Sequence, residues 1–247
     1  MPSLRRYSLS RPKLLSLLDE LKASSVETGT LCLPAGASKA ELDDLLVEAS
    51  PFIKVPAEAA AALDESSTGG ILFWGSRRWY FVIPPFPITD STFSRTCEIE
   101  PLHGLLHREF LLGLVMVRLG EYGIGVCKGE KLLSSKVGTG LVHSRHRQGG
   151  SSAHRFERHR EKQMETFFTR VCQHAREHLE PYERQLDYVL YGGTRETTRD
   201  FRKQCTYLSK FDKKTLDRLL NVREINQAGL NAGIQEAWSS RVIQWEG

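Results

Sequence analysis

A glycine pair set among basic residues is the part of the chain whose residue types and spacing could do chemistry. The segment HSRHRQGGSSAHRFERHREKQ runs from His143 to Gln163 and contains the pair at Gly149 and Gly150. Glycine permits positive φ and places no side chain in the way of a substrate. If the turn begins a helix, its unbonded amide N–H groups can hold an anion or a developing oxyanion.

Short polar side chains and cations surround the glycine pair. Gln148 precedes the pair and Ser151 follows it, and both add hydrogen-bonding groups. The arginines around the pair could neutralise phosphates, which is the usual electrostatic footprint of nucleic-acid binding; they are Arg145, Arg147, Arg155, Arg158 and Arg160. A second interpretation stays open, in which a solvated loop leads into a helix with a charged face.

The histidines of the same segment invite a general-base or metal interpretation. Neither an acidic residue nor a cysteine lies at ligand spacing from them, so we expect no metal and no cofactor. His154 lies close to the glycine pair, and we expect this side chain to contact RNA instead.

Length and composition bound the class of protein. The 247 residues, of which 40% are hydrophobic and 26% charged, indicate a globular protein with two domains. The net charge is only +4, but arginine and histidine are concentrated between residues 145 and 162, which predicts one basic surface. We find neither an apolar run of about 18 residues nor a signal-peptide core, and we expect a cytoplasmic protein that does not enter membranes.

The five cysteines are widely scattered and form no CxxC pair. This spacing favours buried free thiols over a zinc site or a disulfide framework. The residues are Cys32, Cys97, Cys127, Cys172 and Cys205.

The first part of the chain, residues 1–100, is predicted to be a small α+β domain with its linker. Apolar spacing, capping signals and glycine turns place its elements as follows: a helix over 14–21, a strand over 30–34, helices over 38–49 and 57–65, a hairpin over 69–85 and an irregular connection over 84–103.

The second part, residues 101–247, is predicted to be an α/β domain, and the fold class of the whole chain is therefore α/β. The expected elements are an antiparallel meander over 110–142, a long amphipathic helix from 153 to about 181, a buried strand over 186–193, and helices over 194–205, 212–222 and 231–245.

The segment HRQGGSSAHRFERHREKQMETFFTRV resembles the loop and helix of archaeal and eukaryotic class I release factors, where the pattern is R-G-G-Q-S-A-L-R-F-A-R-x-R. The residues that match in register are Gly149, Gly150, Ser152, Ala153, Arg155, Phe156, Arg158 and Arg160. The meander, the YVLYGG strand and the final helix follow the order of that family's central domain. The segments LDELKA…GTLCLP and GGILFWG resemble its N-terminal domain.

One departure points to a particular branch of these factors. Ser151 occupies the position of the glutamine in the Gly-Gly-Gln motif. The sequence therefore resembles the Vms-like release-factor family, whose members act on stalled ribosomal complexes and carry a displaced glutamine. That glutamine usually follows the glycines, where this chain has Ala153 and His154, so Gln148 is the nearby substitute.

The resemblance implies a peptidyl-tRNA ester hydrolase that releases nascent chains without a stop codon. Its partners would be the large ribosomal subunit, its rRNA and peptidyl-tRNA. The amides of Gly150 and Ser151 would stabilise the oxyanion, Gln148 would orient water, and Gly149 would let the backbone approach. Two alternatives remain: a non-catalytic ribosome- or tRNA-binding factor, and a nuclease that cuts the tRNA end.

Overall fold

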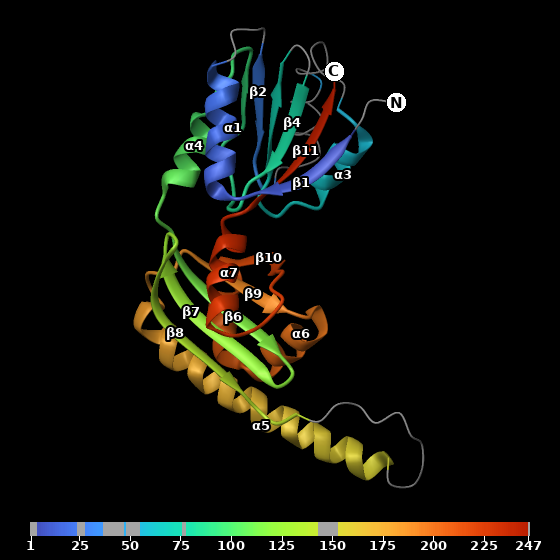
Figure 1. Cartoon of the computed structure of the whole chain (residues 1–247), viewed down its shortest axis with the longest axis vertical. Helices are drawn as coiled ribbons and strands as arrows, with labels where there is room; N and C mark the ends of the chain where they lie inside the picture. Colours follow the sequence, from blue (N-terminus) through green and yellow to red (C-terminus); the bar gives the residue numbers. More distant parts are fainter. Residues whose placement is uncertain are drawn as a thin grey trace. The chain divides into compact units, whose positions relative to one another are not determined.

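The computed structural model describes residues 4–23, 28–36, 47, 55–75, 78–142 and 153–246, without the side chains of residues 153 and 154. The chain forms two compact units, shown in Figure 1. The first is Met1–Arg108 together with Trp238–Gly247, and the second is the intervening chain to Ala237. The boundary between the units lies between Arg108 and Glu109, where the expected one lay between residues 100 and 101, and the C-terminal segment belongs to the first unit. The α/β class is confirmed.

The first unit is a six-stranded antiparallel sheet with helices on both faces (Figure 1). Its strand order is β1-β11-β4-β3-β2-β5. The strands are β1 (Arg5–Leu9), β2 (Gly29–Leu33), β3 (Gly70–Trp74), β4 (Arg78–Ile83), β5 (Thr92–Ser94) and β11 (Ser240–Glu246). The helices are α1 (Arg11–Ala23), α3 (Ala57–Asp64) and α4 (Glu100–His107). The expected hairpin is confirmed as β3 and β4, which pair antiparallel.

Two segments of this unit differ from the expectation. The segment expected as an irregular connection contains β5, which pairs with β2, and the start of α4. The segment expected to close the chain as a helix turns at residue 238 into β11, which lies between β1 and β4. Its branched and aromatic side chains, Val242, Ile243 and Trp245, suit a strand once two neighbouring strands are present to pair with it. The helix expected over 38–49 falls almost wholly outside the described residues.

The second unit is a five-stranded mixed sheet with the order β10-β9-β6-β7-β8. The strands are β6 (Leu111–Arg118), β7 (Glu121–Lys128), β8 (Lys131–Thr139), β9 (Tyr188–Gly193) and β10 (Thr215–Leu220). The first three form the antiparallel meander that the glycine turns predict, and β9 and β10 run parallel to β6.

Helices cover both faces of this second sheet (Figure 1). Helices α5 (Ala153–Leu179) and α6 (Arg195–Gln204) lie on one face, and α7 (Gln227–Ala237) lies on the other. Two 3-10 helices, η1 (Glu180–Tyr182) and η2 (Thr206–Lys214), connect these elements. The expected helix over 212–222 is wrong, because η2 ends at Lys214 and the edge strand β10 occupies Thr215–Leu220. Its buried Leu216 and Leu220 are four residues apart, a spacing that suits both a helix and a strand.

Helix α5 packs on the sheet through only part of its length. Phe167, Val171 and Ala175 are buried in the core with β6, β7 and β9. Phe156, in contrast, is 55% exposed. The first turns of the helix extend past the sheet in Figure 1, so the predicted apolar face does not begin at the N-terminus of the helix.

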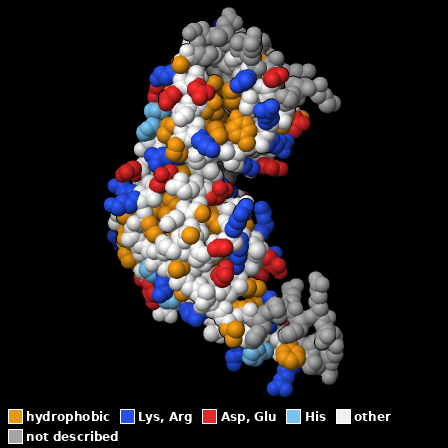
Figure 2. Space-filling model, viewed as in Figure 1, with side chains coloured by type: hydrophobic (Ala, Val, Ile, Leu, Met, Phe, Trp, Pro, Cys, Tyr) orange, Lys and Arg blue, Asp and Glu red, His pale blue; other side chains and the backbone are white. Residues whose placement is uncertain are grey.

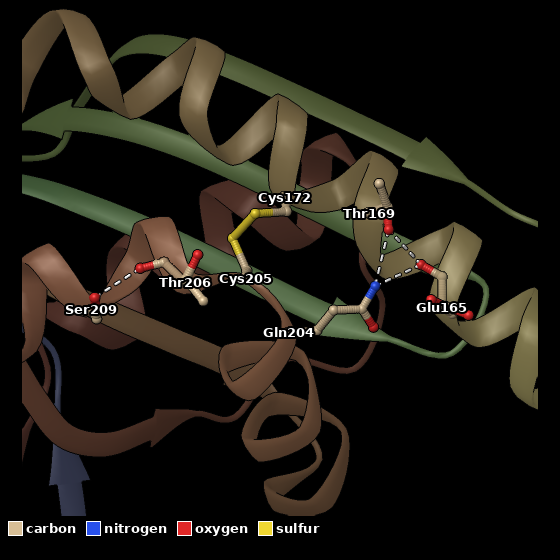
Figure 3. The surroundings of a disulfide bond; sticks show 7 residues. All are labelled: Glu165, Thr169, Cys172, Gln204, Cys205, Thr206 and Ser209. Carbon is tan, nitrogen blue, oxygen red and sulfur yellow. Dashed lines mark hydrogen bonds between the residues drawn. A yellow bond between two sulfur atoms is a disulfide. The ribbon is translucent and has the colours of Figure 1, made fainter.

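A disulfide bond joins Cys172 of α5 to Cys205, the C-cap of α6 (Figure 3). The expectation of free thiols is wrong for this pair. The two residues are 33 apart in sequence, and only the packing of both helices on one sheet face brings their Cα atoms to 5.4 Å. Beside the disulfide, Gln204 Nε2 donates to Glu165 O at 2.8 Å and to Thr169 Oγ1 at 3.0 Å. The connection between the two helices is therefore covalent as well as polar.

We expect reduction of this disulfide to lower the free energy of unfolding by about 3 to 4 kcal/mol, because the crosslink limits the entropy of the unfolded chain. Urea unfolding followed by circular dichroism, with and without dithiothreitol, measures the change. The double variant Cys172→Ala/Cys205→Ala is the matched control and should not respond to the reductant. A wild-type chain that is equally stable in both buffers would contradict the expectation.

Candidate functional site

The structure describes the two flanks of the glycine pair. The residues expected to be catalytic or to bind RNA before α5 lie outside the described residues; they are Arg145, Arg147, Gln148, Gly149, Gly150 and Ser151. His154 lies in the first turn of α5, and its side chain is also outside the described set. The geometry of the site is therefore built from the end of β8 and from α5.

The end of β8 is fixed to α5 where the chain leaves the sheet. Arg170 Nη2 donates to Thr139 O at 2.6 Å, and the Gly140 amide donates to Gly120 O at 2.8 Å. A Cβ atom on Gly140 would lie 2.4 Å from Arg170 Nη2 and 2.5 Å from the Phe167 ring, so only glycine fits this approach. Contacts with α5 therefore fix the position of the chain at Thr139 and Gly140.

Four basic side chains share one exposed face at the start of α5. Arg155, Arg158, His159 and Lys162 occupy positions i, i+3, i+4 and i+7, which fall on one side of a helix with 3.6 residues per turn. All four are exposed. We call them the α5 cation row. Figure 2 shows basic and histidine side chains at this end of the molecule's second unit.

Arg160 is not part of the α5 cation row. It precedes Met164, Phe167 and Val171 by four, seven and eleven residues, so it lies in line with the buried face of the helix. Its side chain is half-buried. The structure thus brings Arg155 and Arg158 together and separates Arg160 from them.

Acidic residues follow a row of their own. Glu157, Glu161 and Glu165 are spaced by four, and Glu161 and Glu165 lie beside the α5 cation row, three residues from Arg158 and Lys162 respectively. Like charges at spacings of three and four destabilise a helix by about 0.2 to 0.5 kcal/mol per pair. A polyanion bound along the row would reduce the repulsion among its cations, so four exposed cations on one side of the helix suit a surface that contacts phosphates.

A cavity of about 220 Å³ lies between α5 and the residues that follow β8. Its lining consists of Gly140, Leu141, His159, Lys162, Gln163, Thr166, Phe167 and Arg170. Sequence reasoning missed two of its basic members, Lys162 and Arg170, and considered His159 only as a general base or metal ligand. The spacing of His159 and Lys162 from Arg155 was the available signal, whereas Arg170 becomes recognisable only from its bond to Thr139.

The chemistry available here is that of hydrogen-bond donors and positive charge. Arginine and lysine can bind phosphate oxygens, and His159 adds a ring that can donate or accept. In the parts of the chain that the structure describes, no cluster of three His, Cys, Asp or Glu residues could hold a metal ion. The described helices also include none long and apolar enough to cross a membrane.

Several curated relatives resemble the chain in sequence. Over 160 residues it is 32% identical to peptide chain release factor subunit 1 of Archaeoglobus fulgidus, which covers 62% of this chain and 38% of that protein. Over 164 residues it is 28% identical to the protein of the same name from Pyrococcus abyssi, covering 65% of this chain and 39% of the other. The chain thus spans about two fifths of the length of these relatives.

Among solved structures, the archaeal translation termination factor aRF1 matches 93% of this chain and 70% of its own chain, with 23% sequence identity and a TM-score of 0.43. Pelota from Archaeoglobus fulgidus matches 93% of this chain and 62% of its own, with 10% identity and a TM-score of 0.29. The sequence model of the Actinobacteria/chloroflexi VLRF1 release factor matches residues 111–243, which is more than half of the chain. The chain belongs to this release factor family.

Proposed function

We propose that this protein is a peptidyl-tRNA hydrolase that acts in the cytoplasm on stalled ribosomal complexes and releases the nascent chain without a stop codon. The observation that carries the proposal is the α5 cation row, which directly follows the glycine pair in a chain of the release factor family. In this reaction water attacks the carbonyl carbon of the ester between peptide and tRNA. The ester C–O bond breaks, the ribose oxygen takes a proton, and a free peptide leaves with intact tRNA.

Each residue of the glycine segment has a separate role in the hydrolysis. Gly149 and Gly150 let the backbone approach the ester, since neither presents a side chain. The amides of Gly150 and Ser151 donate to the tetrahedral oxyanion, and Gln148 orients the attacking water. This assignment needs no metal ion, because the developing negative charge is met by backbone donors.

The basic residues hold RNA around the reacting ester. Arg145, Arg147 and His154 lie next to the glycines in sequence, and Arg155 and Arg158 extend the positive charge along α5. Their partners are phosphates of the large-subunit rRNA and of the tRNA. Arg160 contributes less, because it projects from the core-facing side of the helix.

The direct test supplies the purified protein to large ribosomal subunits that carry a labelled peptidyl-tRNA. The proposal expects free peptide together with full-length tRNA. No release at saturating protein would instead identify a binding factor, which is the rival suggested by Ser151 in place of glutamine. Shortened tRNA would identify a nuclease.

Gln148→Ala should slow peptide release by about 100-fold, because water that is not held in line loses the advantage of positioning. Single-turnover release measures this rate, and co-sedimentation with the subunits should show unchanged binding. Gln185→Ala, at an exposed position of the same unit, is the control and should retain the wild-type rate. Unchanged release by Gln148→Ala would leave the chemistry to the backbone amides.

Replacing Arg155 and Arg158 together with alanine should weaken binding to the subunits and flatten its salt dependence. Each lost phosphate contact should lower the slope of log affinity against log salt by about 0.7 to 0.9. Binding titrations over a range of KCl concentrations give both quantities. Arg160→Ala is the matched control on the other side of the helix; an equal effect from Arg160→Ala would refute the assignment to the α5 cation row.

A further inference from the structure

A second basic cavity lies in the same unit, between α6, η2 and the edge strand β10. Its volume is about 390 Å³. The lining contains five cations and two carboxylates, an excess of three positive charges; these residues are Arg195, Arg199, Arg202, Lys203, Arg218, Asp212 and Asp217. None of them belongs to the α5 cation row or to the glycine segment. We call this space the α6 cavity.

Part of this positive charge is held in place by contacts within the protein. Arg202 Nη2 pairs with Asp212 Oδ1 at 2.8 Å, and its guanidinium lies over the Tyr191 ring, 4.7 Å from the centroid. Arg218 donates to the carbonyls of Glu236 and Ala237 at the end of α7. These contacts hold both guanidinium groups in fixed orientations, and Asp212 balances the charge of Arg202.

Other cations of the α6 cavity remain available for a ligand. Arg195 and Lys203 are exposed, and neither forms an ion pair with another residue that the structure describes. Between them on α6, one helical turn from each, lies Arg199, whose Nε pairs with Asp200 Oδ1 at 3.2 Å while its Nη groups are not in that pair. The three side chains therefore form a line along the rim, which a strand with a phosphate at every nucleotide can follow.

Two buried hydroxyl groups complete the α6 cavity. Tyr191 is 2% exposed and Thr198 is 5% exposed, and both line the space. Within the described residues, Thr198 Oγ1 makes no hydrogen bond, whereas Tyr191 Oη interacts with the side chain of Thr215, which also lines the cavity. A buried polar atom left unpaired costs about 1 to 3 kcal/mol, so such atoms indicate a partner that binds there.

The protonation of these groups makes the α6 cavity a site rich in donors. Burial raises the pKa of Tyr191 to about 12, so its hydroxyl keeps its proton at neutral pH. Thr198 Oγ1 and the guanidinium and ammonium groups can donate as well. The favoured ligand is thus an anion with several acceptor oxygens, which describes a phosphate better than a carboxylate. Leu208, Leu216 and Leu219 add apolar surface beside the charges, against which a ribose or base can pack.

We propose that the α6 cavity binds the phosphate backbone of an RNA strand. One phosphate lies against Arg202 and the hydroxyls of Tyr191 and Thr198, and its neighbours follow Arg195, Arg199 and Lys203. The choice of RNA rests on the proposed function, because a factor that acts on ribosomal complexes is surrounded by rRNA and tRNA. The site is a second RNA contact, separate from the α5 cation row and from the chemistry at the glycine pair.

The test uses the full chain and a fluorescein-labelled oligouridine of 12 nucleotides, with binding followed by anisotropy over a range of KCl. The variant Arg195→Glu/Lys203→Glu should bind at least about tenfold more weakly, and its slope against log salt should fall by about 1.4 for two lost contacts. Arg184→Glu/Lys131→Glu changes the net charge equally at exposed positions outside the cavity and is the matched control. Equal weakening by both double variants would overturn the proposal.

Thr198→Val gives a test without any change of charge. It removes only the buried hydroxyl and keeps the side-chain shape, so the fold should hold, while oligouridine binding should weaken about tenfold through loss of a hydrogen bond to a charged group. Hydrogen–deuterium exchange should also show that the RNA protects residues 195–204 and 215–219. Wild-type affinity in Thr198→Val, or absence of this protection, would refute the site.

Competition separates the possible ligands. Excess unlabelled oligouridine should displace the labelled strand, whereas uridine monophosphate or a polyglutamate peptide that displaces it more effectively would overturn the assignment to an RNA strand.

The release assay separates this proposal from the proposed function. A wild-type protein that binds oligouridine through the cavity but releases no peptide would contradict only the proposed function, whereas wild-type release together with unchanged oligouridine binding by the cavity variants would contradict only the cavity.

Discussion

The packing of the second half of α5 against the sheet is the constraint on which the rest of the second unit depends. Phe167, Val171 and Ala175 are buried there, and Arg170 holds the end of β8 to the same part of the helix. A helix is stiff over several turns because each turn is hydrogen-bonded to the next. Because the second half of α5 is packed on the sheet, the position of its exposed first half, and of the cations on it, is also determined.

This arrangement explains how charge can be concentrated without loss of the fold. The α5 cation row carries mutual repulsion that an isolated helix would relieve by fraying. Here the buried half supplies the stability, so the exposed half can keep side chains selected for binding. Exposed ion pairs contribute at most about 1 kcal/mol each to stability, and the acidic row of Glu157, Glu161 and Glu165 changes this balance little. The four cations therefore stay exposed on one side of the helix.

The sequence correctly predicted the elements that depend on residues close together in the chain. The meander and the hairpin follow from glycine turns between apolar runs, and α5 follows from its helical period. The edge strand β10 and the inner strand β11 depend on partners elsewhere in the chain, so their apolar spacing was misinterpreted as helical. The Cys172–Cys205 disulfide has the same character, because it exists only once α5 and α6 lie on one sheet face.

The site shows the same limit at the level of single side chains. Register with the release factors placed Arg155, Arg158 and Arg160 in one group, but a helix separates residues that a motif places together. Arg160 turns toward the core, whereas His159 and Lys162, which carry no part of the motif, join the exposed row. The helical period, which sets Arg160 in line with Met164 and Phe167, decides which member of a basic run can reach a phosphate, and a match of motif letters does not show that period.

The contacts between α5 and α6 fix the positions of the two basic surfaces relative to each other. The disulfide and the bonds from Gln204 to Glu165 and Thr169 join the helix of the α5 cation row to the helix that lines the α6 cavity. An RNA strand bound to the α5 cation row and long enough to reach the α6 cavity has a raised effective concentration there, because the second contact is intramolecular. Two contacts on joined helices also restrict how the second unit can turn on its RNA. A single basic patch would bind with comparable charge but leave that rotation free, and ester hydrolysis by backbone amides tolerates little misalignment.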